Sequence, residues 1–220
     1  MRIALIGYGK MGRMIEGLAP EFGVEVVGRV DSPTDPLPND FDVAIDFSEP
    51  AVVVENVRRV AETGKNLVIG TTGWADRMGE VQQIVDAAGI GAVYSANFSI
   101  GVNVFLSVVE RAAELMSRYP EYEAWAYEVH HSAKKDAPSG TLLQLTETMR
   151  TAGYAARIDV ASSRAGRVPG THTIGFDSAA DTITLTHTAR SREGFARGAL
   201  LAAKLIVGKR GLIPFASILS

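Results

Sequence analysis

Residues 1–12 have the sequence MRIALIGYGKMG, in which an apolar run leads into a G-x-G-x-x-G motif. The run predicts a buried parallel strand, and the apolar residues that follow at helical spacing predict a helix closed by Pro20. In this context Gly7 permits a tight turn, Gly9 lets the backbone approach a pyrophosphate, and Gly12 allows close helix packing. The motif therefore predicts a dinucleotide site; turn glycines in an α/β protein that binds no dinucleotide are the competing interpretation.

Alternating strands and helices continue over roughly the first hundred residues. We expect strands at 24–30, 43–47, 66–70 and 92–95, helices at 50–63 and 75–88, and a Pro-rich loop from Ser32 to Asn39. Units of this length predict an α/β fold with a Rossmann-type, doubly wound parallel sheet that has helices on both faces. The expected dinucleotide-binding domain covers residues 1–100.

The pattern then changes to that of an α+β domain with an open mixed sheet, which we expect over residues 101–192. Its elements are predicted as helices at 102–119 and 142–152 and strands at 123–130, 158–162, 173–176 and 182–189. A final helix is expected at 195–207. The C-terminal segment, residues 193–220, is expected to pack back on the N-terminal domain.

Composition narrows the possible functions. The chain has 220 residues, 46% hydrophobic and 21% charged, a net charge of −3 and no cysteine. These values predict a packed core, and they argue against a nucleic-acid partner, a membrane partner and any thiolate chemistry. The N-terminus is typical of a first strand and not of a signal peptide, so we expect a cytoplasmic protein.

Asp31, at the end of the second predicted strand, complements the glycine motif. Its carboxylate is placed to bind ribose hydroxyls and would repel a 2′-phosphate, so NADH is favoured over NADPH. Arg29, on the same side of a regular strand, or Lys10 in the glycine loop could tolerate the phosphate.

Two further turns fall at the carboxyl edge of the predicted sheet, where dinucleotides bind. Their candidate nicotinamide and ribose contacts are Gly70, Thr71 and Thr72 after the fourth strand and Ala96, Asn97, Phe98 and Ser99 after the fifth. Ordinary turn and helix-capping chemistry explains these residue types equally well.

Residues 128–141, EVHHSAKKDAPSGT, form the densest polar cluster in the chain. Lys134 and Lys135 supply positive charge, and the Ser139–Thr141 backbone at a helix start can hold a carboxylate. Histidine or lysine could donate a proton as the substrate gains a hydride. Solvated charge and a capped helix are the alternative.

Including this loop, the chain resembles the dihydrodipicolinate reductase family along essentially its whole length. The similar blocks are GYGKMGRM, DVAIDFSEP, VIGTTGW, SANFSIGVNV, HHSAKKDAPSGT, RVPGTHTIGF and TLTHTARSREGFARGA. The resemblance implies that His130 and Lys134 form the acid-base pair and that His131, Gly140 and Thr141 contact substrate carboxylates. It implies that the cofactor, NADH or NADPH, is held by Gly7, Tyr8, Gly9, Lys10, Met11, Gly12, Asp31, Gly70 to Thr72 and Ala96 to Ser99.

The resemblance further implies reduction of an unsaturated cyclic dicarboxylate, or of its hydroxylated precursor after loss of water, to tetrahydrodipicolinate for lysine and diaminopimelate synthesis. It implies a homotetramer assembled through the C-terminal sheets. Ser132 and Ala133 depart from the basic residue and histidine of many relatives, and the segment between Phe176 and Thr182 is short.

No metal is expected, because His172 and His187 lie in strands without acidic or cysteine companions. Two other functions remain: another Rossmann amino-acid dehydrogenase, such as a diaminopimelate or aspartate dehydrogenase, and a non-catalytic dinucleotide sensor.

Overall fold

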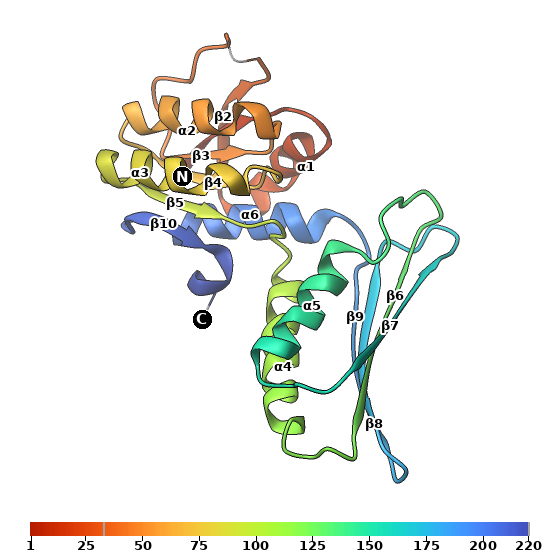
Figure 1. Ribbon diagram of the computed structural model, residues 1–220. Coiled ribbons are helices and arrows are strands. Elements are labelled where there is room, and N and C mark those ends of the chain that lie inside the picture. Colours follow the sequence, from red (N-terminus) through yellow and green to blue (C-terminus); the bar gives the residue numbers. More distant parts are fainter. Residues whose placement is uncertain (33, 220) are drawn as a thin grey trace. The chain divides into compact units, whose positions relative to one another are not determined.

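The computed structural model describes residues 1–32 and 34–219, which form two compact units (Figure 1). One unit combines Met1–Ile100 with Glu193–Ser220, and the other is Gly101–Arg192. The loop predicted at Pro33 and the end of the C-terminal segment, Ser220, lie outside the described residues. Within the described ranges, no helix has the length and apolar character needed to cross a membrane.

The first unit contains a parallel sheet of six strands. Their order across the sheet is β2 (Glu25–Val30), β1 (Arg2–Ile6), β3 (Val43–Asp46), β4 (Asn66–Ile69), β5 (Gly91–Tyr94) and β10 (Gly211–Pro214). The chain leaves β1 for β2 on one side and returns to β3 on the other. The sheet therefore has its topological switch point at the carboxyl end of β1, where ligands bind in doubly wound folds.

Helices cover both faces of this sheet. One core joins apolar residues of β1 and β3 to α1 (Lys10–Leu18) and α6 (Glu193–Leu205). The second core lies on the other face, against α2 (Val53–Glu62) and α3 (Met78–Ala88). Short 3₁₀ turns, η2 (Pro50–Val52) and η3 (Ala75–Arg77), precede α2 and α3, so each predicted single helix begins with a tighter turn. The predicted Rossmann-type fold class is confirmed.

The sequence analysis did not predict β10 or the short turn η4 (Phe215–Ile218) that follows it. Gly211–Pro214 pairs in parallel with Gly91–Tyr94 and becomes the edge strand next to β5. Phe215 is fully buried against the core that contains α1 and α6, and Phe98 lies beside it with ring centroids 4.8 Å apart. The end of the chain thus completes the first sheet.

The second unit contains a mixed sheet of four strands in the order β7 (Ile158–Arg164), β6 (Glu123–His130), β8 (Thr171–Asp177) and β9 (Thr182–Thr188). β6 runs parallel to β7 and antiparallel to β8. α4 (Ile100–Met116) and α5 (Gly140–Thr151) pack on one face of this sheet (Figure 1). The hydrophobic core of the second unit lies between these helices and the sheet. Because side chains alternate along a strand, the even-numbered residues of β6 and β8 face this core.

Candidate active site

The glycine turn after β1 leaves room for a ligand at one of its three glycines. Gly7 has a φ of +85°, and a Cβ atom there would lie 2.3 Å from the Phe47 carbonyl oxygen. A Cβ on Gly12 would lie 2.4 Å from the Gly7 carbonyl oxygen, whereas one on Gly9 would meet no atom within 4 Å. Packing of the protein itself therefore requires Gly7 and Gly12, while the space beside Gly9 opens into a cleft of about 430 Å³.

Asp31 lies in the same cleft, at the end of β2. Its Oδ1 accepts a hydrogen bond of 2.9 Å from the backbone N–H of Tyr8, in the glycine turn. Helix α1 starts directly after Gly9, and no side chain caps its first turn. The helix start can therefore offer N–H groups and its positive dipole to a pyrophosphate, and Asp31 can offer a carboxylate to ribose hydroxyls. These residues fit a dinucleotide.

The two cations considered for a 2′-phosphate differ in their surroundings. Arg29 forms an ion pair with Glu16, with Nε 3.2 Å from Oε2, and its guanidinium lies 5.6 Å from the centre of the Tyr8 ring. Lys10 is exposed at the start of α1. A phosphate would have to compete with Glu16 for Arg29, so Arg29 is poorly available.

Asp46, at the end of β3, is a buried carboxylate that connects three segments around the cleft. Oδ1 accepts hydrogen bonds from the Ser48 N–H at 2.9 Å and from the hydroxyls of Ser48 and Thr71 at 2.7 Å each, and Oδ2 accepts from Asn56 Nδ2 at 2.9 Å. Ser48 and Asn56 line the cleft beside Gly9. Asp46 thus holds the ends of β3 and β4 in place.

The turns after β4 and β5 contain the other predicted cofactor residues. Thr71, Thr72 and Ala96 line a smaller pocket together. Asn97 Oδ1 accepts from the Ser99 N–H at 2.9 Å, which is ordinary turn chemistry. The side chain of Phe98 is 2% exposed in the core, so only its backbone could reach a ligand. Gly70 packs against Phe47, whose ring would lie 2.2 Å from a Cβ.

In the second unit, Glu128 is at the centre of the polar cluster. Its side chain is fully buried, and Oε1 accepts hydrogen bonds from the Ser139 N–H at 2.9 Å, Ser162 Oγ at 2.9 Å and Arg164 Nη2 at 3.1 Å. Burial by itself would raise the pKa of this carboxyl group, but the hydrogen bonds outweigh it and the net pKa is lowered. Glu128 is therefore a buried carboxylate held by two segments, the start of α5 through Ser139 and β7 through Ser162 and Arg164.

Two histidines face the other oxygen of Glu128. Oε2 lies 3.3 Å from His130 Nδ1 and 3.5 Å from His172 Nε2. Burial lowers the pKa of His130 while the charge of Glu128 opposes the shift, and burial together with His130 lowers the pKa of His172 to about 4. The expectation that His172 has no acidic companion is wrong, because β6 and β8 place Glu128 and His172 directly opposite each other.

Glu128, His130 and His172 offer ligand atoms within 4.8 Å of one another, a spacing that a metal ion could use. The surrounding charge disfavours one, because Arg164 lies 3.1 Å from the same carboxylate. Lys134 also contributes positive charge, which opposes protonation of both histidines. The cluster is better suited to holding and moving protons.

The loop after β6 leads to α5 and carries the remaining candidates. Lys134 Nζ donates to Asp136 Oδ1 at 2.9 Å. Ser139 caps α5, accepting from the Leu142 N–H at 3.2 Å, and a Cβ on Gly140 would meet no atom within 4 Å. His131 and Thr141 are half-buried. The start of α5 is thus accessible and anchored to Glu128 through the Ser139 N–H.

Two family models together match almost the whole chain. "Dihydrodipicolinate reductase, N-terminus" matches residues 1–98, and "Dihydrodipicolinate reductase, C-terminus" matches residues 101–219. The chain belongs to the dihydrodipicolinate reductase family. This membership makes it an oxidoreductase.

Individual relatives of this reductase cover nearly all of its length or the whole of it. The 4-hydroxy-tetrahydrodipicolinate reductase of Christiangramia forsetii is 36% identical over 100% of this chain and 98% of its own. That of Xanthomonas euvesicatoria pv. vesicatoria is 40% identical over 94% of this chain and 80% of its own. A dipicolinate-bound dihydrodipicolinate reductase from Paenisporosarcina sp. TG-14 shares the fold, with a TM-score of 0.82, 21% identity and 97% of each chain covered.

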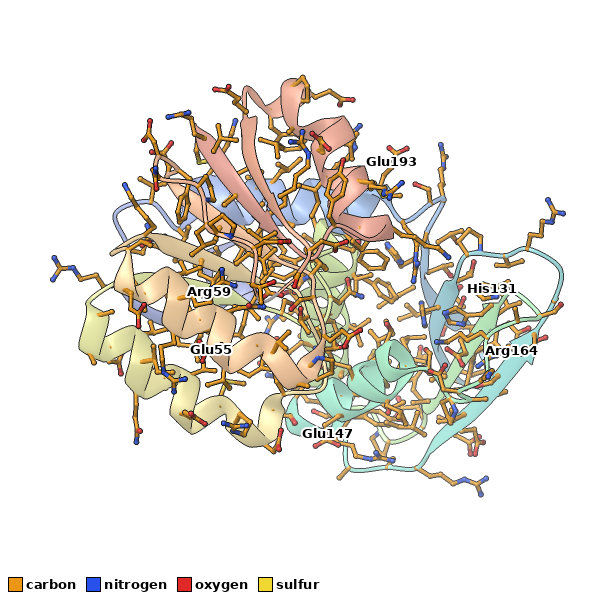
Figure 2. The ribbon with its side chains drawn as sticks, turned by 90° about the horizontal axis from the view of Figure 1, so that it is seen from above. Glu55, Arg59, His131, Glu147, Arg164 and Glu193 are labelled. Carbon is orange, nitrogen blue, oxygen red and sulfur yellow. The ribbon has the colours of Figure 1, made fainter. Side chains whose placement is uncertain are left out.

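Sequence reasoning missed four polar residues of this reductase: Asp46, Glu128, Arg164 and His172. Arg164, labelled in Figure 2 with His131, ends β7 and donates to Glu128 and to the Asp136 carbonyl oxygen. One signal was present, because Glu128 precedes His130 by two residues in a predicted strand and so shares its face. Nothing in the sequence places Arg164 or His172 beside them.

Proposed function

We propose that this chain reduces dihydrodipicolinate, formed from 4-hydroxy-tetrahydrodipicolinate by loss of water, to tetrahydrodipicolinate in lysine and diaminopimelate synthesis. The observation that carries this proposal is the polar cluster of the second unit, in which an HH-x-x-K loop and an open helix start are joined through Glu128. A helix start binds carboxylates, and the loop supplies proton donors. The proposed biosynthetic role implies a cytoplasmic enzyme.

The residues then have distinct roles. The glycine turn, Gly7 to Gly12, binds the pyrophosphate of NADH or NADPH, and Asp31 binds ribose hydroxyls. The bound nicotinamide supplies a hydride. Gly140, Thr141 and His131 hold the substrate carboxylates, and His130 or Lys134 delivers the proton that balances the hydride. No step in this scheme requires a metal ion.

A turnover assay tests the function. We expect the protein to oxidise NADH only when 4-hydroxy-tetrahydrodipicolinate is present, and to form one tetrahydrodipicolinate per NADH. Activity with an amino acid or a semialdehyde in its place would indicate another Rossmann dehydrogenase. Cofactor binding without turnover of any of these substrates would indicate a dinucleotide sensor.

Asp31 leads to a prediction about the choice of cofactor, which we propose favours NADH. Asp31→Ala should weaken NADH binding by about 10-fold or more, because a hydrogen bond to a charged group contributes roughly 1.5–3 kcal/mol. NADPH binding should weaken less, since the substitution also removes repulsion of the 2′-phosphate. Dissociation constants of both cofactors, measured by calorimetry, provide the check.

Asp31→Asn is the matched control, because its amide oxygen can still accept the hydrogen bond from the Tyr8 N–H. It should reduce the discrimination between the two cofactors without loosening the glycine turn. A parent protein that strongly prefers NADPH would contradict this interpretation of Asp31.

We propose that the chain assembles as a homotetramer through the face of the second sheet that carries no helix of its own unit. This face presents a row of threonines on β8 and β9, with Trp125 lying over Gly175 and Tyr127 37% exposed. The pairs Thr171–Thr188 and Thr173–Thr186 hydrogen-bond across the two strands. Hydroxyl and aromatic side chains thus occupy the middle of this face, and such a surface is suited to a second copy.

Sedimentation equilibrium checks the assembly. We expect the mass of four chains for the parent protein and smaller species for Thr173→Glu, which places a charge in the middle of the face without touching the buried core. A monomeric parent protein would contradict the proposal.

A further inference from the structure

Glu128 uses its two oxygens for different neighbours. Oε1 accepts three hydrogen bonds, from Ser139, Ser162 and Arg164. Oε2 and His130 Nδ1 are both buried and face each other at 3.3 Å, and among the described residues neither completes a hydrogen bond. Catalytic hydrogen bonds are often long before substrate binds and tighten in the complex. Oε2 of Glu128, which also lies 3.5 Å from His172 Nε2, is thus placed to accept a hydrogen bond from His130 Nδ1.

The His130 ring is confined from the opposite side as well. A Cβ on Gly170 would lie 2.9 Å from His130 Nε2, so only a glycine fits against the ring there. The His172 ring contacts it edge to face, with centroids 5.0 Å apart. A carboxylate beside Nδ1 favours the tautomer with the proton on Nδ1 and stabilises the charged ring. Glu128 is therefore in the position from which a carboxylate can orient His130 and select the Nδ1-protonated ring.

The register of the sheet fixes which residues lie beside Glu128. Glu128 is paired with Ser162 on β7 and with His172 on β8. Titratable or charged groups face His130 from its own strand, from β7, from β8 and from the loop. Glu128 favours protonation of His130, and Arg164, Lys134 and His131 oppose it. His172 on β8 contacts the ring, and its own pKa is lowered by His130. Glu128 is the one acidic group among them, so its removal would leave the positive charges unbalanced.

We propose that Glu128 is a positioning residue of the reductase, which orients His130 through Oε2 and fixes the substrate-binding start of α5 through Oε1. The kinetic consequences of this proposal rest on the proposed function. The position of the proton on His130 Nδ1 is independent of that function.

Glu128→Gln tests the kinetic part, because it keeps the size of the side chain and an oxygen for Ser139 but removes the charge. We expect kcat to fall about 10- to 100-fold, less than on loss of the acid itself, with KM changed by less than about three-fold. The inflection of kcat/KM that reports His130 should move to lower pH, because the charge favouring the protonated ring is gone. Glu147→Gln, an exposed carboxylate on α5 labelled in Figure 2, is the matched control and should leave these values unchanged.

A double-variant comparison separates positioning from a general structural role. In a His130→Gln background, Glu128→Gln should cost less than about three-fold in kcat, because there is no longer a histidine to orient. The same loss in both backgrounds, or an unmoved pH inflection, would overturn the proposal.

Nitrogen-15 NMR of the parent protein tests the structural part without any turnover and without a variant that could fail to fold. Above the pKa of His130 we expect its ring to carry the proton on Nδ1. The tautomer protonated on Nε2 would refute the role of Glu128, even if the enzyme reduces its substrate as proposed. Conversely, the Nδ1 tautomer in a protein that lacks reductase activity would refute only the proposed function.

Discussion

Gly9→Val should raise the dissociation constant of NADH by at least about 100-fold while the protein stays folded. In the proposed cofactor site the pyrophosphate approaches the backbone at this glycine, and a branched side chain would occupy its place. The fold should tolerate the change, because a Cβ at Gly9 meets no atom within 4 Å. Calorimetric titration with NADH and a thermal unfolding curve measure the two effects separately.

Two other glycines provide the comparison for this prediction. Gly17, exposed on the same helix and equally free of contacts, can become valine as a matched control that should bind NADH normally. Gly12→Val should instead destabilise the fold, since its Cβ would lie 2.4 Å from the Gly7 carbonyl oxygen. Unchanged NADH affinity in the folded Gly9→Val variant would refute the assignment of the cofactor site.

Most strands and helices could be predicted because their signals are local. The buried run before Gly7 and the helical spacing after it identify β1 and α1. β10 was missed for a physical reason: Gly211–Pro214 is short, and what makes it a strand is pairing with Gly91–Tyr94, far away in the chain. Parallel pairing over such a distance leaves no periodic pattern in the four residues themselves.

The residues of the candidate site also divide into those that the sequence predicts and those that only strand pairing brings together. His130, Lys134 and the α5 start lie within one short segment, so the sequence alone brings them together. Glu128 meets His172 only through the antiparallel register of β6 and β8, and Arg164 reaches it from β7. Burial then changes the titration of His172. Its pKa, ordinarily 6.5 in water, is lowered to about 4 among these neighbours.

His130→Gln and Lys134→Ala should each lower kcat by about 10²- to 10⁴-fold, the usual contribution of general acid catalysis. An interaction made only in the transition state affects turnover before affinity, whereas Thr141→Val should mainly raise KM by removing a carboxylate contact. If both groups serve one proton transfer, the loss of kcat in the double variant should be much smaller than the product of the two single losses. NADH affinity should be nearly unchanged, because the glycine turn and this loop belong to different units.

The pH dependence distinguishes the two candidates for the acid. Burial lowers the pKa of His130 below its ordinary 6.5, with Glu128 opposing the shift and Lys134 and Arg164 adding to it. An acid must be protonated, so if His130 is the donor, kcat/KM should fall as pH rises through a pKa below 6.5. That decrease should vanish in His130→Gln and persist in Lys134→Ala.

The single variants also test a different role for Lys134. If Lys134 instead holds a carboxylate, its removal should raise KM strongly and spare kcat. Near-normal kcat in both single variants would show that this loop takes no part in the chemistry.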